Sequence, residues 1–119
     1  MSEIKGEDYT VKHDVEANTV IFQGELALGS SSEYQPIKDM LNELIESQPA
    51  TATVNLRELT FLNSSGISLL SKFVLGLRKN KEVQLVILGS NGIPWQSKSL
   101  QNLEKLLPTI KLELEGDPS

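Results

Sequence analysis

Ser64, Ser65 and Gly66 stand where a strand-like run of the sequence gives way to a helix-like run. This position puts two hydroxyl groups on the first turn of the expected helix. Backbone N–H groups there lack an intrahelical acceptor, and the positive end of the helix macrodipole favours negative charge. The residue types and their spacing therefore predict a place that can hold a phosphate group.

The same segment also has a purely structural interpretation. Asn63 or Ser64 can serve as the N-cap of the helix, which contributes about 1 kcal/mol to helix stability. Gly66 can be required only because the helix and the preceding strand approach each other closely. Spacing alone does not separate this interpretation from a phosphate site.

Catalytic side chains are scarce in the rest of the chain. His13 is the only histidine, and its place beside Asp14 on a predicted strand indicates an exposed surface residue. The chain has no cysteine, which excludes a thiolate nucleophile and leaves no set of ligands for a zinc site. Nothing in the spacing suggests a serine, histidine and acid triad. We therefore expect a protein that is not an enzyme and that uses no cofactor or metal.

Length and charge narrow the class of protein further. A chain of 119 residues predicts one domain, ordered over about residues 8–114 with short polar tails. Its formal net charge is −5, and its eleven Lys and Arg residues are scattered, which argues against nucleic acid and anionic membranes as partners. No apolar run approaches the roughly 20 residues that span a bilayer, and the first residues do not resemble a signal peptide. We expect a cytoplasmic protein.

The first half of the chain predicts a hairpin followed by a helix. Residues 9–13 alternate as a strand, and residues 19–22 read as a second strand. Residues 24–28 lead into a loop, and the first eight residues are expected to be loose. Ser32 and Gln35 have the spacing of a capping box before a helix that Pro49 ends. The apolar stripe of that helix is Ile37, Met40, Leu41, Leu44 and Ile45.

The second half predicts alternating strands and helices. Residues 51–56 and 83–88 read as buried strands, separated by a helix over residues 64–79. Ser97 or Ser99 is expected to cap a last helix, with Leu100, Leu103 and Leu107 facing inward. Residues 110–114 alternate as a possible edge strand, and residues 115–119 are expected to be a solvated tail.

The apolar set of the helix over residues 64–79 is wider than one core-facing stripe. Such a stripe usually covers little more than 100° of the helix surface. Leu69 and Leu75 are among the residues left over, so either another element covers them or they contact a partner. The whole element order predicts an α/β fold, with a mixed four- to five-stranded sheet and helices packed mainly on one face.

The segment from Leu56 to Ile67 resembles the signature of STAS domains, the family of the anti-sigma-factor antagonists. In that family a strand, a segment of the form L-x-x-L/V-x-F-(hydrophobic)-D-S-S-G and a helix follow in this order. Gly24-Glu25-Leu26 resembles the G-E-L-D that follows the family's second strand, although the acidic residue after the leucine is missing here. The resemblance covers about residues 8–114.

This resemblance implies a regulatory binding protein in a partner-switching pathway. A serine kinase, often itself an anti-sigma-type protein, would phosphorylate Ser64, with Ser65 as second choice, and a serine phosphatase would reverse the reaction. The unphosphorylated form would bind the kinase or another target, and we expect a monomer. The implied motif and partner-binding residues are Asn63, Ser64, Ser65, Gly66, Ile67, Leu69, Leu75 and Glu25.

One departure from the family pattern leaves alternatives open. Asn63 stands where the family usually has aspartate, which removes a charge beside the serine hydroxyl. A STAS module that scaffolds or binds partners without phosphorylation is therefore a second hypothesis. A small-ligand or nucleotide binder that uses the same helix start is a third.

Overall fold

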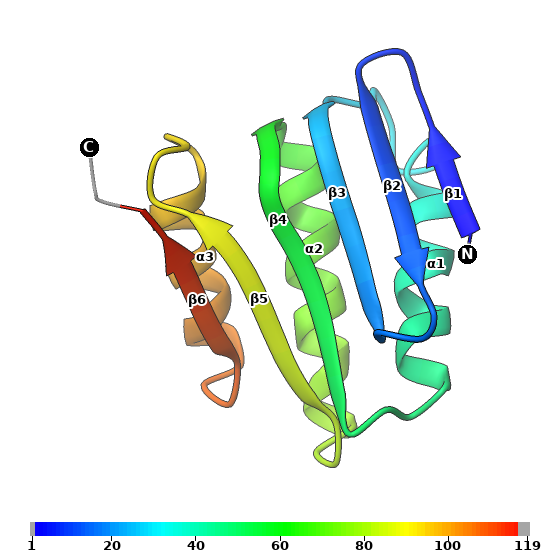
Figure 1. The fold of residues 1–119 in the computed structure, drawn as a ribbon, viewed down its shortest axis with the longest axis vertical. Coiled ribbons are helices and arrows are strands. Elements are labelled where there is room, and N and C mark those ends of the chain that lie inside the picture. The colour runs from blue at the N-terminus through cyan, green and yellow to red at the C-terminus, as the bar shows by residue number, and fades with distance from the viewer. Residues whose placement is uncertain (1, 117–119) are drawn as a thin grey trace.

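A six-stranded sheet forms the framework of the chain in the computed structural model, which describes residues 2–116. Three helices lie against the sheet, and all of them cover the same face (Figure 1). The elements in chain order are β1 (Ser2–Lys5), β2 (Tyr9–Asp14), β3 (Thr19–Leu26), α1 (Gln35–Glu46), β4 (Thr51–Leu62), α2 (Ser64–Gly76), a 3₁₀ turn (Leu77–Lys79), β5 (Gln84–Ser90), α3 (Gln96–Leu106) and β6 (Lys111–Glu115).

The sheet is mixed, and its strand order is the chain order β1-β2-β3-β4-β5-β6. The first three strands pair antiparallel, whereas β3, β4, β5 and β6 pair parallel through helical crossovers. The predicted fold class, a mixed α/β sheet with helices on one face, is confirmed. The sheet has six strands rather than four to five.

The additional strand comes from the N-terminal residues. The prediction that the first eight residues are loose was wrong, because Ser2–Lys5 pairs antiparallel with β2. The segment is polar because it is an edge strand, where charged side chains such as Glu3 and Lys5 are usual. Polarity alone therefore did not distinguish an edge strand from a tail.

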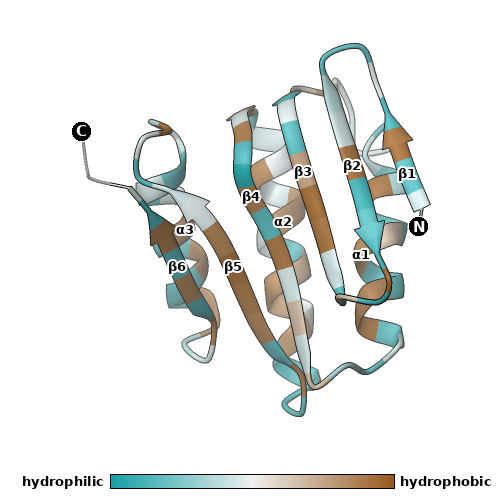
Figure 2. Ribbon diagram, viewed as in Figure 1, coloured by the Kyte–Doolittle hydropathy of each residue, from teal (hydrophilic) through white to brown (hydrophobic). Residues whose placement is uncertain are grey.

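The core lies between the sheet and the three helices. The predicted stripe of α1 faces inward, with only Ile45 half-buried. Strand β5 has the most continuous hydrophobic run of the sheet (Figure 2), although the helices cover only one face of it and not both, as its continuous apolar run predicted. In α3, Leu100 and Leu103 are buried as predicted, whereas Leu107 is half-buried just after the helix.

Several predicted boundaries and exposures were wrong. His13 is buried rather than exposed, because its side chain shares the covered face of β2 with Val11, and its Nδ1 atom has no hydrogen-bond partner within the described residues. Helix α1 starts at Gln35 with Tyr34 before it, and α3 starts at Gln96 with Trp95 before it; neither helix has a side-chain cap. Helix α2 ends at Gly76 and continues only as a 3₁₀ turn.

Strand β3 also runs further than predicted, to Leu26, and β4 runs to Leu62 instead of residue 56. Beyond Leu56 the burial of β4 changes from every second to every third residue, so its period no longer reads as a strand. Glu115 belongs to β6 and forms an ion pair with Arg57, with 3.1 Å between Nε and Oε2. The rest of the predicted tail, residues 117–119, lies outside the described residues.

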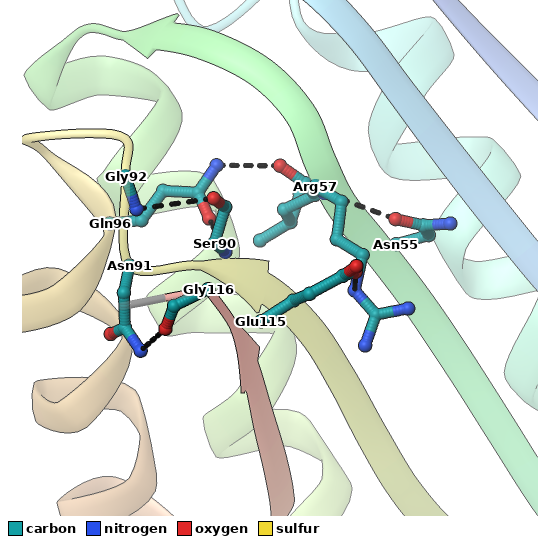
Figure 3. Close-up of polar contacts among 9 residues, drawn as sticks. Asn55, Arg57, Ser90, Asn91, Gly92, Gln96, Glu115 and Gly116 are labelled. Atoms are coloured by element: carbon teal, nitrogen blue, oxygen red, sulfur yellow. Dashed lines mark hydrogen bonds and ion pairs between the residues drawn. The ribbon is translucent and has the colours of Figure 1, made fainter. Parts of the chain in front are cut away.

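Strands β4 and β5 separate before β4 ends. Their pairing stops at Asn55 and Leu88, and the side chain of Gln96 enters the gap (Figure 3). Its Nε2 donates to the carbonyl oxygens of Leu56 and Leu59 at 2.6 and 2.9 Å, and its Oε1 accepts from the Ser90 N–H at 2.7 Å. A fully buried glutamine thus takes the place of the missing strand pairing and fixes the end of β4 from which α2 begins.

Candidate functional site

Asn63 forms the junction between β4 and α2. It has extended backbone angles, φ −78° and ψ 174°, and its Oδ1 accepts a hydrogen bond of 3.0 Å from the Gly66 N–H. This is the geometry of an N-cap, in which the side chain satisfies one of the free donors of the helix. Of the two candidates from the sequence, Asn63 is the cap and Ser64 is not.

The Asn63 side chain also closes a ring of hydrogen bonds with Tyr34 and Leu28. The Tyr34 hydroxyl donates to Asn63 Oδ1 at 2.6 Å and accepts from the Leu28 N–H at 3.3 Å. Asn63 Nδ2 donates to the Leu28 carbonyl at 2.9 Å. The loop after β3, the start of α1 and the start of α2 are therefore held together by one amide side chain.

Tyr34 is buried, with 2% of its surface exposed, and its hydroxyl lies at the centre of the ring. Burial raises the pKa of Tyr34 above its ordinary value of 10.0, although the hydrogen bond from the Leu28 backbone opposes this shift. The phenol is therefore neutral at physiological pH and can donate a hydrogen bond to Asn63 Oδ1.

Gly66 is needed for close packing at this junction. A Cβ atom on Gly66 would lie 2.8 Å from the Tyr34 hydroxyl and 2.9 Å from Leu62 Cγ, closer than real Cβ contacts. Helix α2 and strand β4 therefore approach each other closely at Gly66, as predicted. The Tyr34 hydroxyl also contacts this position.

Ser64 and Ser65 are exposed on the first turn of α2. Among the described residues, neither hydroxyl takes part in a hydrogen bond, and neither backbone N–H has an acceptor. Asn63 provides the cap, so both serine hydroxyls remain exposed and unengaged among the described residues. Two backbone donors at the positive end of the helix also remain accessible.

A groove of about 830 Å³ runs between α1 and α2, and both serines line one end of it. Its apolar lining includes Leu41 and Ile45 from α1, and Leu69 and Phe73 from α2. Lys38 from α1 and Lys72 from α2 also line it. The described residues of the lining include no Asp or Glu, in a chain with sixteen of them.

The structure brings together only some of the predicted partner-binding residues. Leu69 lines the groove with the serines, whereas Leu75 is exposed outside it and Ile67 is half-buried outside it. Glu25 lies on β3 opposite Phe61 of β4 and outside the groove. Its neighbour Leu26 is buried, so Glu25 points toward the face of the sheet without helices.

Three residues of the site were not predicted from the sequence. Tyr34 precedes α1, and nothing local marks its hydroxyl as a partner of Asn63, 29 positions later. Lys38 and Lys72 are ordinary solvated positions on their own helices. The pairing of α1 with α2 places them on one groove, and that pairing has no local sequence signal.

Solved structures with this architecture provide a comparison for the whole chain. Neither a protein-family model nor a curated protein matches the sequence. The fold matches that of SiaC. The chain superimposes on SiaC in the complex of the diguanylate cyclase SiaD with its activator SiaC, from Pseudomonas aeruginosa, with a TM-score of 0.75 and 14% identity over 97% of this chain and 100% of that one. Apo-SiaC gives a TM-score of 0.73 and 11% identity over 98% and 100% of the two chains.

At these identities the likeness to SiaC concerns the fold. It agrees with the expected mixed α/β architecture of one domain. Within residues 2–116, no helix is long and apolar enough to cross a membrane. The same residues contain no cluster of three His, Cys, Asp or Glu side chains that could hold a metal ion.

Proposed function

We propose that this protein is a non-enzymatic regulator that binds a partner through the groove between α1 and α2, and that phosphorylation of Ser64 switches this binding off. The observation that carries the proposal is the position of Ser64. It is exposed, its hydroxyl is unengaged among the described residues, and it lines the end of the groove. A serine kinase would add the phosphate and a serine phosphatase would remove it.

The fold tolerates a phosphate at this position. A phosphoserine at the first residue of α2 lies beside the free N–H groups of Ser64 and Ser65 and at the positive end of the helix dipole. The ring around Asn63 does not involve the Ser64 side chain, so modification leaves it in place. We therefore expect phosphorylation to change the charge of the groove and to leave the fold intact.

Asn63 is compatible with this role. The resemblance to STAS domains implies aspartate at this position, but here the side chain must donate to the Leu28 carbonyl, and a carboxylate cannot donate. The hydrogen bond to Leu28 therefore explains why this position holds asparagine rather than aspartate. It still caps the helix and leaves the Ser64 hydroxyl free.

The likeness to SiaC supports a binding role over a catalytic one. SiaC is the activator of the enzyme SiaD and forms a complex with it. By analogy of fold, the partner class is an enzyme that this protein activates or restrains. The geometry supports a switch at the start of α2, where both serines are exposed and line the groove, and the resemblance to the STAS motif singles out Ser64.

Intact mass spectrometry of the protein incubated with ATP and an extract of its native host tests the proposal. We expect one added phosphate, which Ser64→Ala abolishes and Ser65→Ala retains. The neighbouring serine is a matched control because it is also exposed and lies on the same helical turn. Labelling that persists unchanged in Ser64→Ala would contradict the assignment.

A second measurement addresses the switch. Proteins recovered from the same extract with the wild type should be lost with Ser64→Asp and kept with Asn102→Asp, which adds the same charge at an exposed position outside the groove, with both variants folded by circular dichroism. Equal recovery with Ser64→Asp and wild type would instead support a module that binds partners without control by phosphorylation.

A further inference from the structure

The charge and shape of the groove between α1 and α2 differ from those of the rest of the molecule. The chain carries a formal net charge of −5. The groove nevertheless holds Lys38 on one wall and Lys72 on the other, and no carboxylate among its described lining residues. Within residues 2–116, neither lysine forms an ion pair. Two unneutralised cations thus face a shared opening on an acidic protein.

The floor of the groove is apolar but not fully covered. Leu41 and Leu77 are buried at its base, whereas Ile45, Leu69 and Phe73 are half-buried and present apolar surface to the opening. Partly exposed apolar surface bordered by polar residues is typical of sites that bind another protein. The lysines and serines supply that polar border here.

The groove is elongated. Both Ser64 and Gly76 line it, so it follows α2 over the whole of its 13 residues. At a rise of 1.5 Å per residue this length is about 18 Å, or more than three turns of a docked helix. A compact ligand would occupy only part of such a groove, whereas an amphipathic helix would fill it with residues spaced three and four apart.

We propose that the occupant of this groove is an acidic amphipathic helix of the partner protein. Its apolar face packs on Ile45, Leu69 and Phe73, and carboxylates beside that face pair with Lys38 and Lys72. This inference rests on the proposed function, since it names the chemistry of the partner that the groove binds.

The same charges explain the direction of the switch. The two lysines contribute +2 to the groove, and a phosphate on Ser64 adds about −1.5 to −2 at physiological pH. Phosphorylation therefore cancels most of the positive charge that attracts an acidic helix and places a dianion at one end of its binding site. The unphosphorylated protein is the form that binds.

The test uses two designed peptides of about 18 residues, long enough to form three or more helical turns. Both carry leucine on one face, and one has glutamate and the other lysine beside that face. Each is titrated into the full ¹⁵N-labelled chain and followed by NMR. The acidic peptide should shift amides of α1 and α2 along the groove, and the basic peptide should bind roughly tenfold more weakly.

Matched variants assign the effect to the two lysines. Each exposed charge is worth a few-fold in affinity, so Lys38→Glu with Lys72→Glu should weaken the acidic peptide by roughly tenfold and favour the basic one. Lys81→Glu with Lys98→Glu changes the net charge equally at exposed positions outside the groove and should leave the preference unchanged. A similar loss in both double variants would show a non-specific charge effect and overturn the proposal.

Four other outcomes would also overturn it. The two peptides could bind equally, or shift amides outside α1 and α2. Inorganic phosphate could by itself reproduce the shifts and displace the peptide, which would make the groove a small-anion site. The protein could instead dimerise through these helices without peptide, as light scattering would show.

Failure of this inference is distinguishable from failure of the proposed switch. A chain that becomes phosphorylated on Ser64 but does not prefer the acidic peptide contradicts only the partner chemistry. If the wild type and Ser64→Asp prefer the acidic peptide to the same degree, only the switch is contradicted.

Discussion

The Tyr34 hydroxyl donates a hydrogen bond of 2.6 Å to Asn63 Oδ1, the atom that also caps α2 through Gly66. Tyr34, immediately before α1, thereby holds Asn63, immediately before α2. Since these two helices form the walls of the groove, the Tyr34–Asn63 contact fixes the end of the groove at which Ser64 lies.

Asn63→Asp should destabilise the protein although it restores the usual residue of the STAS motif. A carboxylate can still cap Gly66 and accept from Tyr34, but it cannot donate to the Leu28 carbonyl. The unsatisfied carbonyl outweighs the gain from a negative charge at the helix start, so we expect a loss of about 1–2 kcal/mol in the free energy of unfolding. Urea denaturation measures it.

Asn55→Asp is the control for this change. Asn55 uses its Oδ1 to accept from the Arg57 N–H, and a carboxylate keeps that acceptor. The control should cost less than Asn63→Asp. If the two variants are equally stable, donation by the Asn63 amide does not matter.

Tyr34→Phe should cost about 1 kcal/mol, because Asn63 loses a donor while the ring still fills its space. The variant should also change the response to alkali. Burial raises the pKa of Tyr34 above 10.0 in the folded protein, so the folded state keeps the phenol proton at a pH where the unfolded chain releases it. The resulting stabilisation is complete below pH 10 and is lost as the pH rises through the folded-state pKa.

Denaturation at a series of pH values above 9 tests this expectation. The free energy of unfolding of the wild type should fall with pH more steeply than that of Tyr34→Phe. Parallel curves would mean that the buried hydroxyl does not contribute.

Gly66→Ala should destabilise the fold by about 1–3 kcal/mol, because the added methyl group meets Leu62 and the Tyr34 hydroxyl. Gly76→Ala is the matched change in the same helix, where an added Cβ atom meets nothing within 4 Å. The second variant should be stabilised by roughly 0.5–1 kcal/mol through helix propensity. Opposite signs in thermal melts are the expected result, and equal destabilisation would refute the packing argument.

Gln96→Leu should be among the most damaging single changes. It leaves the Leu56 carbonyl and the Ser90 N–H without these partners at a fully buried position, whereas the Leu59 carbonyl keeps its hydrogen bond from Trp95 Nε1. Each buried polar group left without a partner costs about 1–3 kcal/mol, so a total of several kcal/mol is expected. Gln101→Leu, on the exposed side of the same helix, should change stability by less than about 0.5 kcal/mol.

The sequence predicted the parts of the fold that depend on local periodicity. The stripe of α1 and the continuous apolar run of β5 each follow from a 3.6-residue or strand pattern. The end of β4 was missed because its burial follows a period of three once Gln96 replaces β5 as its partner. A strand whose neighbour is a side chain from a distant helix has no local signature.

Only the part of the candidate site that has a local sequence pattern could be predicted. Asn63, Ser64 and Gly66 are consecutive or nearly so, and their motif marks a helix start. Tyr34 and the two lysines enter the site through the packing of α1 beside α2, which depends on tertiary contacts. His13 was predicted to be exposed from its residue type, although it alternates in the strand with Val11, beside which the structure buries it.

The identity of strand order and chain order has a consequence for how this protein reaches its folded state. Each strand pairs only with the strands immediately before and after it in the sequence. No strand has to wait for a distant segment, so the loops closed at each step are those of one hairpin or one helical crossover. The sheet can therefore grow from β1 towards β6 while the chain is being synthesised, each new strand docking on an edge that already exists.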